Sequence, residues 1–339
     1  MGERVLVTGG AGFIGSNLVA DLVERGREVV VYDNLSRKGT SANLEWLKKT
    51  LRDRIEFIEA DVCDFDSLRR AASGVRTIYH LAAQVAVTTS VIDPRTDFQS
   101  NAIGAFNVLE AARLSAERPV LVFTSTNKVY GGMEDIRVEE DETRYRFAER
   151  VDGVSEERPL DFHSPYGCSK GAADQYVRDY ARIYGLPTLV FRMSCIYGPR
   201  QFGNEDQGWV AHFLISGLKG RPLTVYGNGK QVRDILYVGD LLSAFHAAVE
   251  RIETVRGSIY NIGGGKDNTL SLLELLELMK GKYDYRVSPS FADRRPGDQP
   301  IYVSDIRKAR RELGWEPAVG SSEGVDMLHR WILDNENML

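Results

Sequence analysis

Tyr166 and Lys170 lie four residues apart, a spacing that places a phenol and an ammonium group on the same face of a helix. A phenol has a pKa of about 10 and is a poor base at neutral pH, but a neighbouring cation stabilises the phenolate and lowers that pKa. One lysine and the positive ring of an oxidised nicotinamide could together supply this stabilisation. The pair therefore suggests the oxidation of an alcohol, although many solvent-facing helices carry the same two residues at this spacing.

The elements that must position this pair alternate between strands and helices. Short apolar runs predict strands at 5–7, 28–32, 55–60, 77–81 and 120–123. The clearest helical spacing between them lies at 17–25 and 101–114. Apolar strands joined by helices indicate an α/β fold with a doubly wound parallel sheet of the Rossmann type. Ligands of such a sheet bind beyond the carboxyl ends of its strands, so we expect the site there.

A glycine-rich turn after the first strand predicts a dinucleotide site. Gly9, Gly12 and Gly15 fit the G-x-x-G-x-x-G pattern, in which the missing side chains let the backbone approach a pyrophosphate at a helix N-terminus. Asp33 ends the second strand, where a carboxylate binds the adenosine ribose and repels a 2′-phosphate. NAD is therefore expected rather than NADP. Arg37 weakens this preference, because it could accept a phosphate or be a solvated loop residue.

Size and composition predict a globular protein with two lobes and no polyanionic partners. A chain of 339 residues exceeds the usual size of a single core. A net charge of -5 provides no general attraction to nucleic acid or to an anionic membrane, and neither is expected as a partner. Cys63, Cys168 and Cys195 lack metal-ligand spacing, so we expect reduced thiols and no structural metal. With neither a leader pattern nor a long apolar run, the protein is expected to be cytoplasmic.

Two domains are predicted from the change in pattern near residue 190. Residues 1–190 would form the NAD-binding domain and residues 191–339 a smaller α/β substrate domain, with roughly 231–262 packing back on the first. Short elements expected in the second are a strand at 223–226 and helices at 241–250 and 270–280. Residues 134–158 carry ten acidic and five basic side chains, which predicts a solvated surface loop or, alternatively, a lid.

Taken together, the motifs resemble the extended short-chain dehydrogenase/reductase family over nearly the whole chain. They are the glycine turn, Asp33, 61–62, 80–83, 124–126, 166–170, and the later segments 192–200, 233–240 and 295–298. The resemblance implies NAD(P) in the first domain and a nucleotide-activated sugar in the second. The cofactor contacts it implies here are Gly9, Gly12, Phe13, Ile14, Gly15, Asp33, Asn34, Ser36, Arg37, Asp61, Val62, Leu81, Ala82, Ala83, Gln84, Asn101, Thr124, Tyr166, Lys170 and Met193.

The resemblance also implies a catalytic set of Thr126, Tyr166 and Lys170. Thr126 would bond the sugar hydroxyl being oxidised, Tyr166 would remove its proton, and Lys170 would hold the phenolate and the nicotinamide ribose. Family members that eliminate water carry an aspartate and a glutamate directly after the threonine, whereas this chain has Asn127 and Lys128. A 4,6-dehydratase is therefore disfavoured. An epimerase that oxidises the sugar transiently, returns the hydride to the opposite face and keeps NAD tightly bound is favoured.

The substrate is expected from subgroup resemblance alone. Residues 33–47, 124–131 and 191–209 are most similar to epimerases that act at C2 of CDP-activated hexoses. The expected substrate contacts are Gln84, Thr126, Asn127, Lys128, Cys195, Tyr226, Arg233, Arg294 and Arg295. Cys195 stands where the family often has an asparagine, and a packing cysteine is favoured there over a redox thiol.

Two other functions stay open beside a CDP-sugar 2-epimerase. A UDP-sugar 4-epimerase would use the same catalytic set, and nothing in the residues distinguishes cytosine from uracil or thymine. A catalytically silent NAD sensor would be expected to lose the tyrosine or the lysine, and both are present. The resemblance further implies a homodimer or a homotetramer that assembles through the helices at 101–114 and 170–184.

Overall fold

The computed structural model describes residues 2–149, 151–295 and 298–339. By contacts between Cα atoms the chain forms two compact units. Unit 1 contains Met1–Thr126, Ser164–Arg192 and Leu242–Tyr260, and unit 2 contains Asn127–His163, Met193–Leu241 and Asn261–Leu339. The domain boundary proposed near residue 190 stays a prediction. The Pro296 and Gly297 positions of the 295–298 motif lie outside the described residues.

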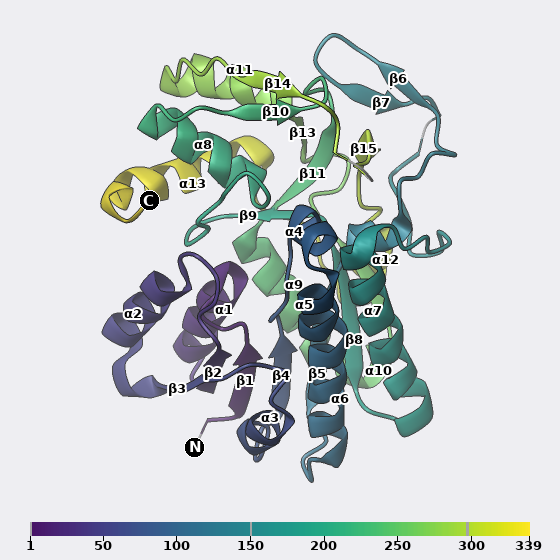
Figure 1. Cartoon of the computed structure of the whole chain (residues 1–339). Coiled ribbons are helices and arrows are strands. Elements are labelled where there is room, and N and C mark those ends of the chain that lie inside the picture. Colours follow the sequence, from purple (N-terminus) through teal and green to yellow (C-terminus); the bar gives the residue numbers. More distant parts are fainter. Residues whose placement is uncertain (1, 150, 296–297) are drawn as a thin grey trace. The chain divides into compact units, whose positions relative to one another are not determined.

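The predicted doubly wound parallel sheet is confirmed. Its seven strands are β1 (Arg4–Thr8), β2 (Glu28–Asp33), β3 (Ile55–Glu59), β4 (Thr77–His80), β5 (Val120–Thr126), β8 (Thr188–Met193) and β12 (Ile259–Ile262). They lie in the order β12-β8-β5-β4-β1-β2-β3, and Figure 1 shows this row from β8 to β3. The strand β1 pairs in parallel with both β2 and β4, so the chain crosses the sheet on leaving β3. Sheets with such a reversal bind ligands beyond the carboxyl ends of their strands at this point.

Helices cover both faces of the sheet, because alternate strand residues point to opposite sides. On one face, Leu6 and Phe123 pack in a buried cluster with residues of α3 (Phe65–Ala71), α6 (Gly104–Leu114) and α7 (Ser164–Tyr184). On the other face, Tyr79 packs against Phe245 of α9 (Val238–Glu250), with ring centroids 5.5 Å apart. The helices α1 (Phe13–Glu24) and α2 (Thr40–Leu51) follow β1 and β2 and pack against each other.

Three short helices lead from β4 to α6 and pack beside α7. They are α4 (Val87–Ile92), α5 (Pro94–Phe98) and the π-helix η2 (Gln99–Ile103), and Figure 1 shows α5 and α6 running alongside α7. The helix that was predicted to begin at residue 101 thus has a π-helical first turn. Single π-helical turns are frequent at functional sites.

Unit 2 has its own core and small sheets. A four-stranded sheet joins β13 (Thr269–Ser271), β11 (Val232–Tyr237) and β15 (Ile301–Tyr302), with β9 (Cys195–Tyr197) also on β11. A second pair consists of β10 (Thr224–Tyr226) and β14 (Ser290–Ala292). The core lies under α8 (Trp209–Lys219), α11 (Leu272–Tyr283) and α13 (Ser321–Asp334), while α12 (Arg307–Leu313) follows β15. The other short helices are η1 (Arg52–Arg54), η3 (Asn127–Tyr130), α10 (Ile252–Val255) and η4 (Glu336–Met338).

The segment 134–158 contains regular structure that its composition did not reveal. The strands β6 (Val138–Glu140) and β7 (Tyr145–Phe147) form an antiparallel hairpin. The hairpin is held by the backbone of Tyr145, which donates to Lys230, and by an ion pair between Arg144 and Glu274 at 3.0 Å. The expectation of a plain surface loop is therefore corrected, because backbone pairing and specific ion pairs hold this charged segment.

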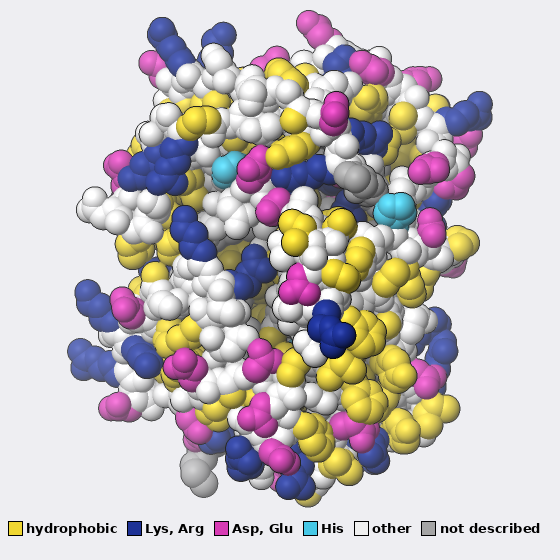
Figure 2. All heavy atoms as spheres, viewed as in Figure 1, with side chains coloured by type: hydrophobic (Ala, Val, Ile, Leu, Met, Phe, Trp, Pro, Cys, Tyr) yellow, Lys and Arg dark blue, Asp and Glu magenta, His cyan; other side chains and the backbone are white. Residues whose placement is uncertain are grey.

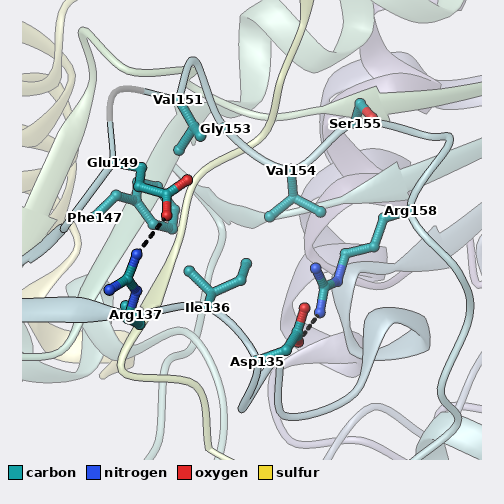
Figure 3. Close-up of a pocket in the computed structure, with 10 residues that line it drawn as sticks. All are labelled: Asp135, Ile136, Arg137, Phe147, Glu149, Val151, Gly153, Val154, Ser155 and Arg158. Atoms are coloured by element: carbon teal, nitrogen blue, oxygen red, sulfur yellow. Dashed lines mark hydrogen bonds and ion pairs between the residues drawn. The ribbon is translucent and has the colours of Figure 1, made fainter.

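This segment also lines a cavity of about 350 Å³ in unit 2. Figure 3 shows an apolar wall of Ile136, Phe147 and Val154 with two ion pairs at its rim, Arg137–Glu149 and Arg158–Asp135. None of the sequence-predicted site residues lines this cavity.

The predicted helix at 270–280 begins later than expected. Leu270 belongs to β13, and α11 starts at Leu272 because Ser271 and Glu274 form a reciprocal capping box. The helices of the described residues include none that is long and apolar enough to cross a membrane.

Candidate active site

The glycine turn brings the start of α1 against the end of β1. A Cβ atom on Gly15 would lie 2.1 Å from the carbonyl oxygen of Gly9, and Gly9 itself has a φ of 70°. Both positions therefore require glycine for the turn to close. A Cβ on Gly12 would meet only that same oxygen, at 3.1 Å, and would otherwise point into open space. Gly12 thus leaves room for a pyrophosphate at the N-terminus of α1, which carries Phe13 and Ile14.

Asp33 is a buried carboxylate at the end of β2, beside the glycine turn. Its Oδ2 accepts from the amide of Ala11 at 3.0 Å, and its Oδ1 accepts from the amide of Leu35 at 2.9 Å. Burial raises the pKa of Asp33, while these amides and the charge of Arg37 oppose the shift. The amide of Gly12 is a third donor to Asp33. A carboxylate has about four acceptor sites, so Asp33 can still accept from a hydroxyl of an adenosine ribose.

The loops after β2 and β3 meet beside Asp33. Asn34 Nδ2 donates to Asp61 Oδ2 at 2.7 Å, and Ser36 Oγ donates to Asn34 Oδ1 at 2.7 Å. Val62, next to Asp61, is buried. The loop that follows β4 is joined to β1, because the amide of Leu81 donates to the carbonyl of Thr8 at 3.0 Å. The carboxyl ends of β1, β2, β3 and β4 thus place these predicted cofactor residues along one edge of the sheet.

Tyr166 lies on the first turn of α7 and is hydrogen-bonded to Thr126 at the end of β5. Burial raises the pKa of Tyr166 to about 12, and the charge of Asp97 adds to the shift. The Thr126 bond and the charge of Arg37 oppose it. The direction is opposite to that expected from a neighbouring lysine. The protein alone therefore keeps this phenol protonated, and ionising it at neutral pH requires a further positive charge.

Lys170 is one turn further along α7 and is also buried. Its Nζ donates to the carbonyl of Thr124 at 2.6 Å and lies 4.2 Å from the centroid of the Phe123 ring. Burial lowers the pKa of Lys170 to about 7, opposed by the charges of Asp174 and Asp97. The ammonium thus points along the end of β5 and titrates near neutral pH.

Asn101 is linked to this region through its neighbours. Its Oδ1 accepts from the amide of Gln84 at 2.9 Å, and its Nδ2 donates to the Gln84 carbonyl at 3.0 Å. The same Nδ2 lies 3.1 Å from both Ser169 Oγ and Asp97 Oδ1. Asn101 therefore ties the loop after β4, with Ala82 and Gln84, to α7.

In unit 2, predicted substrate residues gather around Asp298. Its Oδ1 lies 2.6 Å from Arg233 Nη2 and 3.5 Å from Lys128 Nζ. Although burial raises the pKa of Asp298, the charges of Arg233 and Lys128 hold it below the usual value. Two cations share one carboxylate here, so the cluster carries a net positive charge suited to an anionic ligand.

Three further predicted residues lie around this cluster. Asn127 Nδ2 donates to Gln299 Oε1 at 3.3 Å, and the exposed Arg294 donates to the carbonyl of Asp298. Cys195 begins β9, and burial raises the pKa of its thiol despite the charges of Arg233 and Lys128. A thiol that stays protonated favours the packing role over a redox role.

The Arg295 guanidinium stacks on the ring of Tyr226. The guanidinium carbon of Arg295 lies 3.9 Å from the centroid of the Tyr226 ring. Arg295 Nη2 also contacts the carbonyl of Glu205 at 3.1 Å and Asp206 Oδ1 at 3.3 Å. The loop that contains Glu205 and Asp206 was not among the predicted contacts. Met193, the remaining predicted cofactor residue, ends β8.

Sequence reasoning missed Asp97, Ser169 and Asp298. Asp298 belongs to the 295–298 motif, so its signal was present in the chain. Ser169 directly precedes Lys170, which was also visible. Asp97 had no such signal, because nothing local distinguishes a buried carboxylate from an exposed one.

Comparisons with known proteins find relatives over nearly the whole chain. A family model described as GDP-mannose 4,6 dehydratase matches residues 6–328. The CDP-paratose 2-epimerase of Salmonella typhi is 42% identical over 335 residues, which are 97% of this chain and 98% of that protein.

Two solved structures have the same fold. The UDP-glucose 4-epimerase of Thermotoga maritima, with UDP-glucose, has a TM-score of 0.85 at 32% identity and covers 98% of this chain and 99% of its own. The dTDP-glucose 4,6-dehydratase DesIV of Streptomyces venezuelae, with NAD bound, has a TM-score of 0.82 at 30% identity and covers 98% of both chains.

Proposed function

The chain belongs to the NAD-dependent epimerase/dehydratase family, and we propose that it is a nucleotide-sugar epimerase that acts at C2 of a CDP-hexose. The chain is an NAD-dependent enzyme. The proposed reaction interconverts CDP-paratose and CDP-tyvelose, or sugars of the CDP-glucose type, by transient oxidation at C2.

The observation that carries this proposal is the pair of residues directly after Thr126. Elimination of water needs a carboxyl group there as acid or base, and the chain offers an amide and an ammonium instead. Asn127 is bonded to Gln299, and Lys128 faces Asp298. Reversible oxidation needs only one base, one orienting hydroxyl and one coenzyme, which supports an epimerase over a dehydratase.

In the proposed mechanism, Thr126 orients the C2 hydroxyl and Tyr166 removes its proton. NAD, when bound by the glycine turn and Asp33, supplies the acceptor and donor of the C2 hydride and a positive ring charge that lowers the pKa of Tyr166 and Lys170. Lys170 stabilises the phenolate. Tyr166 then returns the proton to the sugar oxygen, so neither a proton nor a reductant is consumed.

In a plot of kcat/KM against pH we expect an acid limb, the range in which kcat/KM falls as the pH decreases. This limb should begin at or below about pH 7. The active pair holds one proton between Tyr166 and Lys170, and it gains a second as the pH falls through the pKa of Lys170, about 7. Below the limb the rate should fall about tenfold per pH unit, and above it a plateau should persist for as long as the pair keeps its one proton. A profile of kcat/KM against pH measures this limb, and an unchanged rate down to about pH 5 would contradict it.

Asp33→Asn is expected to weaken NAD binding by about tenfold to a hundredfold, because the ribose hydroxyls lose a charged acceptor. NADP should gain relative to NAD, since the repulsion of its 2′-phosphate disappears. Dissociation constants of both coenzymes, measured by calorimetry after release of bound nucleotide, test this. Asp53→Asn, at an exposed acid on η1, is the matched control. Equal affinities of variant and wild type would remove Asp33 from the site.

The choice of nucleotide and carbon is tested by competition and by isotope. We expect CDP to compete with substrate more tightly than UDP or dTDP, whereas tighter binding of UDP would favour the 4-epimerase. Turnover of CDP-paratose in deuterated water should leave C2 without solvent deuterium. Incorporation at C2 would exclude direct hydride return.

We also propose that two copies associate through α6 and α7. Figure 2 shows apolar side chains gathered over this region. The exposed large apolar residues of α5, α6 and α7 are Phe98, Phe106, Leu114, Tyr176, Ile183 and Tyr184. Apolar patches of this kind mark association surfaces. Phe106→Asp should raise the dimer dissociation constant at least about tenfold in sedimentation experiments. Phe291→Asp, at a residue exposed on β14 in unit 2, should leave it unchanged.

A further inference from the structure

Asp97 is a buried carboxylate on α5, which packs against the helix that carries Tyr166 and Lys170. Its exposed fraction is 1%. Ser169 Oγ donates to Asp97 Oδ2 at 2.5 Å, and Asn101 Nδ2 donates to Asp97 Oδ1 at 3.1 Å. Ser169 lies between Tyr166 and Lys170 in the sequence and directly precedes Lys170. Asp97 is thus bonded to a side chain on the helical turn that carries both groups.

The charged groups around Asp97 are few. The neighbouring elements α4 and η2 contain no titratable side chain, and Arg95 on α5 itself is exposed. On α7 the groups are Tyr166, Lys170 and Asp174, and Asp174 is paired with Arg192. Near Lys170 there is also His80, whose pKa burial lowers to about 3, so that it stays neutral. No ion pair within the described residues includes Asp97, so Lys170 is the cation that its charge favours.

Burying a carboxylate that has no ion-pair partner is costly, and it persists where other groups compensate or where its charge has a use. A helix-capping explanation does not account for it, because Asp93 already caps α5 by accepting from the amide of Thr96. We propose that Asp97 is a positioning residue whose buried charge retains the proton of the Tyr166–Lys170 pair and so determines the lowest pH at which the enzyme works. This inference rests on the proposed function of that pair.

The sign of the effect follows from the charge. A negative charge beside the pair favours the protonated forms of both groups and raises the pKa of Lys170 and of Tyr166. Removing it should make the second proton harder to add. The acid limb of kcat/KM should therefore move to lower pH.

The test is the pH profile of Asp97→Asn, which removes the charge but keeps the shape and one of the two acceptor oxygens, the one that can face Asn101 Nδ2. We expect the acid limb to move down by about one pH unit while the NAD affinity stays within about twofold. Asp93→Asn is the matched control, since asparagine also caps helices and solvent screens this exposed charge. Its limb should coincide with that of the wild type.

Ser169→Ala provides a second, independent variant. Without its hydroxyl donor Asp97 is protonated more readily, so the limb should move in the same direction, and Asp97→Asn/Ser169→Ala should move it no further than Asp97→Asn alone. If Asp97→Asn does not fold, the shift in Ser169→Ala decides. An unmoved limb in a folded variant would overturn the role of Asp97. If Tyr166→Phe stayed active, the proposed function itself would fail, so the two failures are distinguishable.

Discussion

Replacing Tyr166 by Phe is expected to lower kcat by at least about 10³-fold, because general-base catalysis is typically worth 10²–10⁴-fold and we assign no second base. The lost hydroxyl is bonded to Thr126, and the ring stays buried, so the fold of α7 should persist. NAD and CDP should bind with nearly wild-type affinity. Steady-state turnover of CDP-paratose, together with calorimetric binding of both nucleotides, measures the two expectations separately.

Tyr180→Phe is the matched control on the same helix. Tyr180 OH donates to Glu110 Oε1 at 2.7 Å, away from the catalytic pair. Its removal should cost roughly 1 kcal/mol of unfolding free energy and leave kcat within about twofold. If Tyr166→Phe kept more than about a tenth of the wild-type kcat, the assigned base would be wrong.

Arg192→Met is expected to lower the free energy of unfolding by about 3–5 kcal/mol. Arg192 Nε and Nη2 donate to the two carboxylate oxygens of Asp174, both at 2.9 Å, and the two side chains are 3% and 0% exposed. Methionine fills much of the volume but leaves Asp174 as an unpaired buried charge. Urea denaturation at saturating NAD measures the loss, which should shift the midpoint without changing the slope.

Arg286→Met is the control for this variant. Arg286 forms an ion pair with Asp284 at 3.5 Å, and the two side chains are 84% and 83% exposed. Solvent screens such a pair, so its loss should change stability by no more than about 0.5 kcal/mol. A similar small change in Arg192→Met would mean that Asp174 finds another partner.

The fold followed from local patterns in the sequence. The short apolar runs at 5–7 and 28–32 became β1 and β2, and the glycine turn between β1 and α1 formed as its pattern predicts. Such features depend on the periodicity of nearby residues, which a sequence displays directly. The hairpin β6–β7 did not follow, because its pairing depends on partners such as Glu274 that are remote in the chain.

The candidate site was partly predictable for the same reason. Tyr166 and Lys170 share a helix, and Gly9 to Gly15 share a turn, so local spacing placed them. The association of Lys128 with Asp298, or of Asp97 with Ser169, joins residues far apart in sequence. Motif spacing identifies which residues are present, and it does not say which side chains meet.

By itself the sequence determined the residue chemistry: a phenol and an ammonium one helical turn apart, a glycine turn with a terminal carboxylate, and no carboxyl group after Thr126. Only the tertiary structure decided the electrostatic state of these groups. Burial raises the pKa of Tyr166 to about 12 and lowers that of Lys170 to about 7. The packing of α5 against α7 places the charge of Asp97 near both groups. The reason is physical, because a pKa depends on solvent exclusion and on nearby charges, and both arise when distant segments pack together.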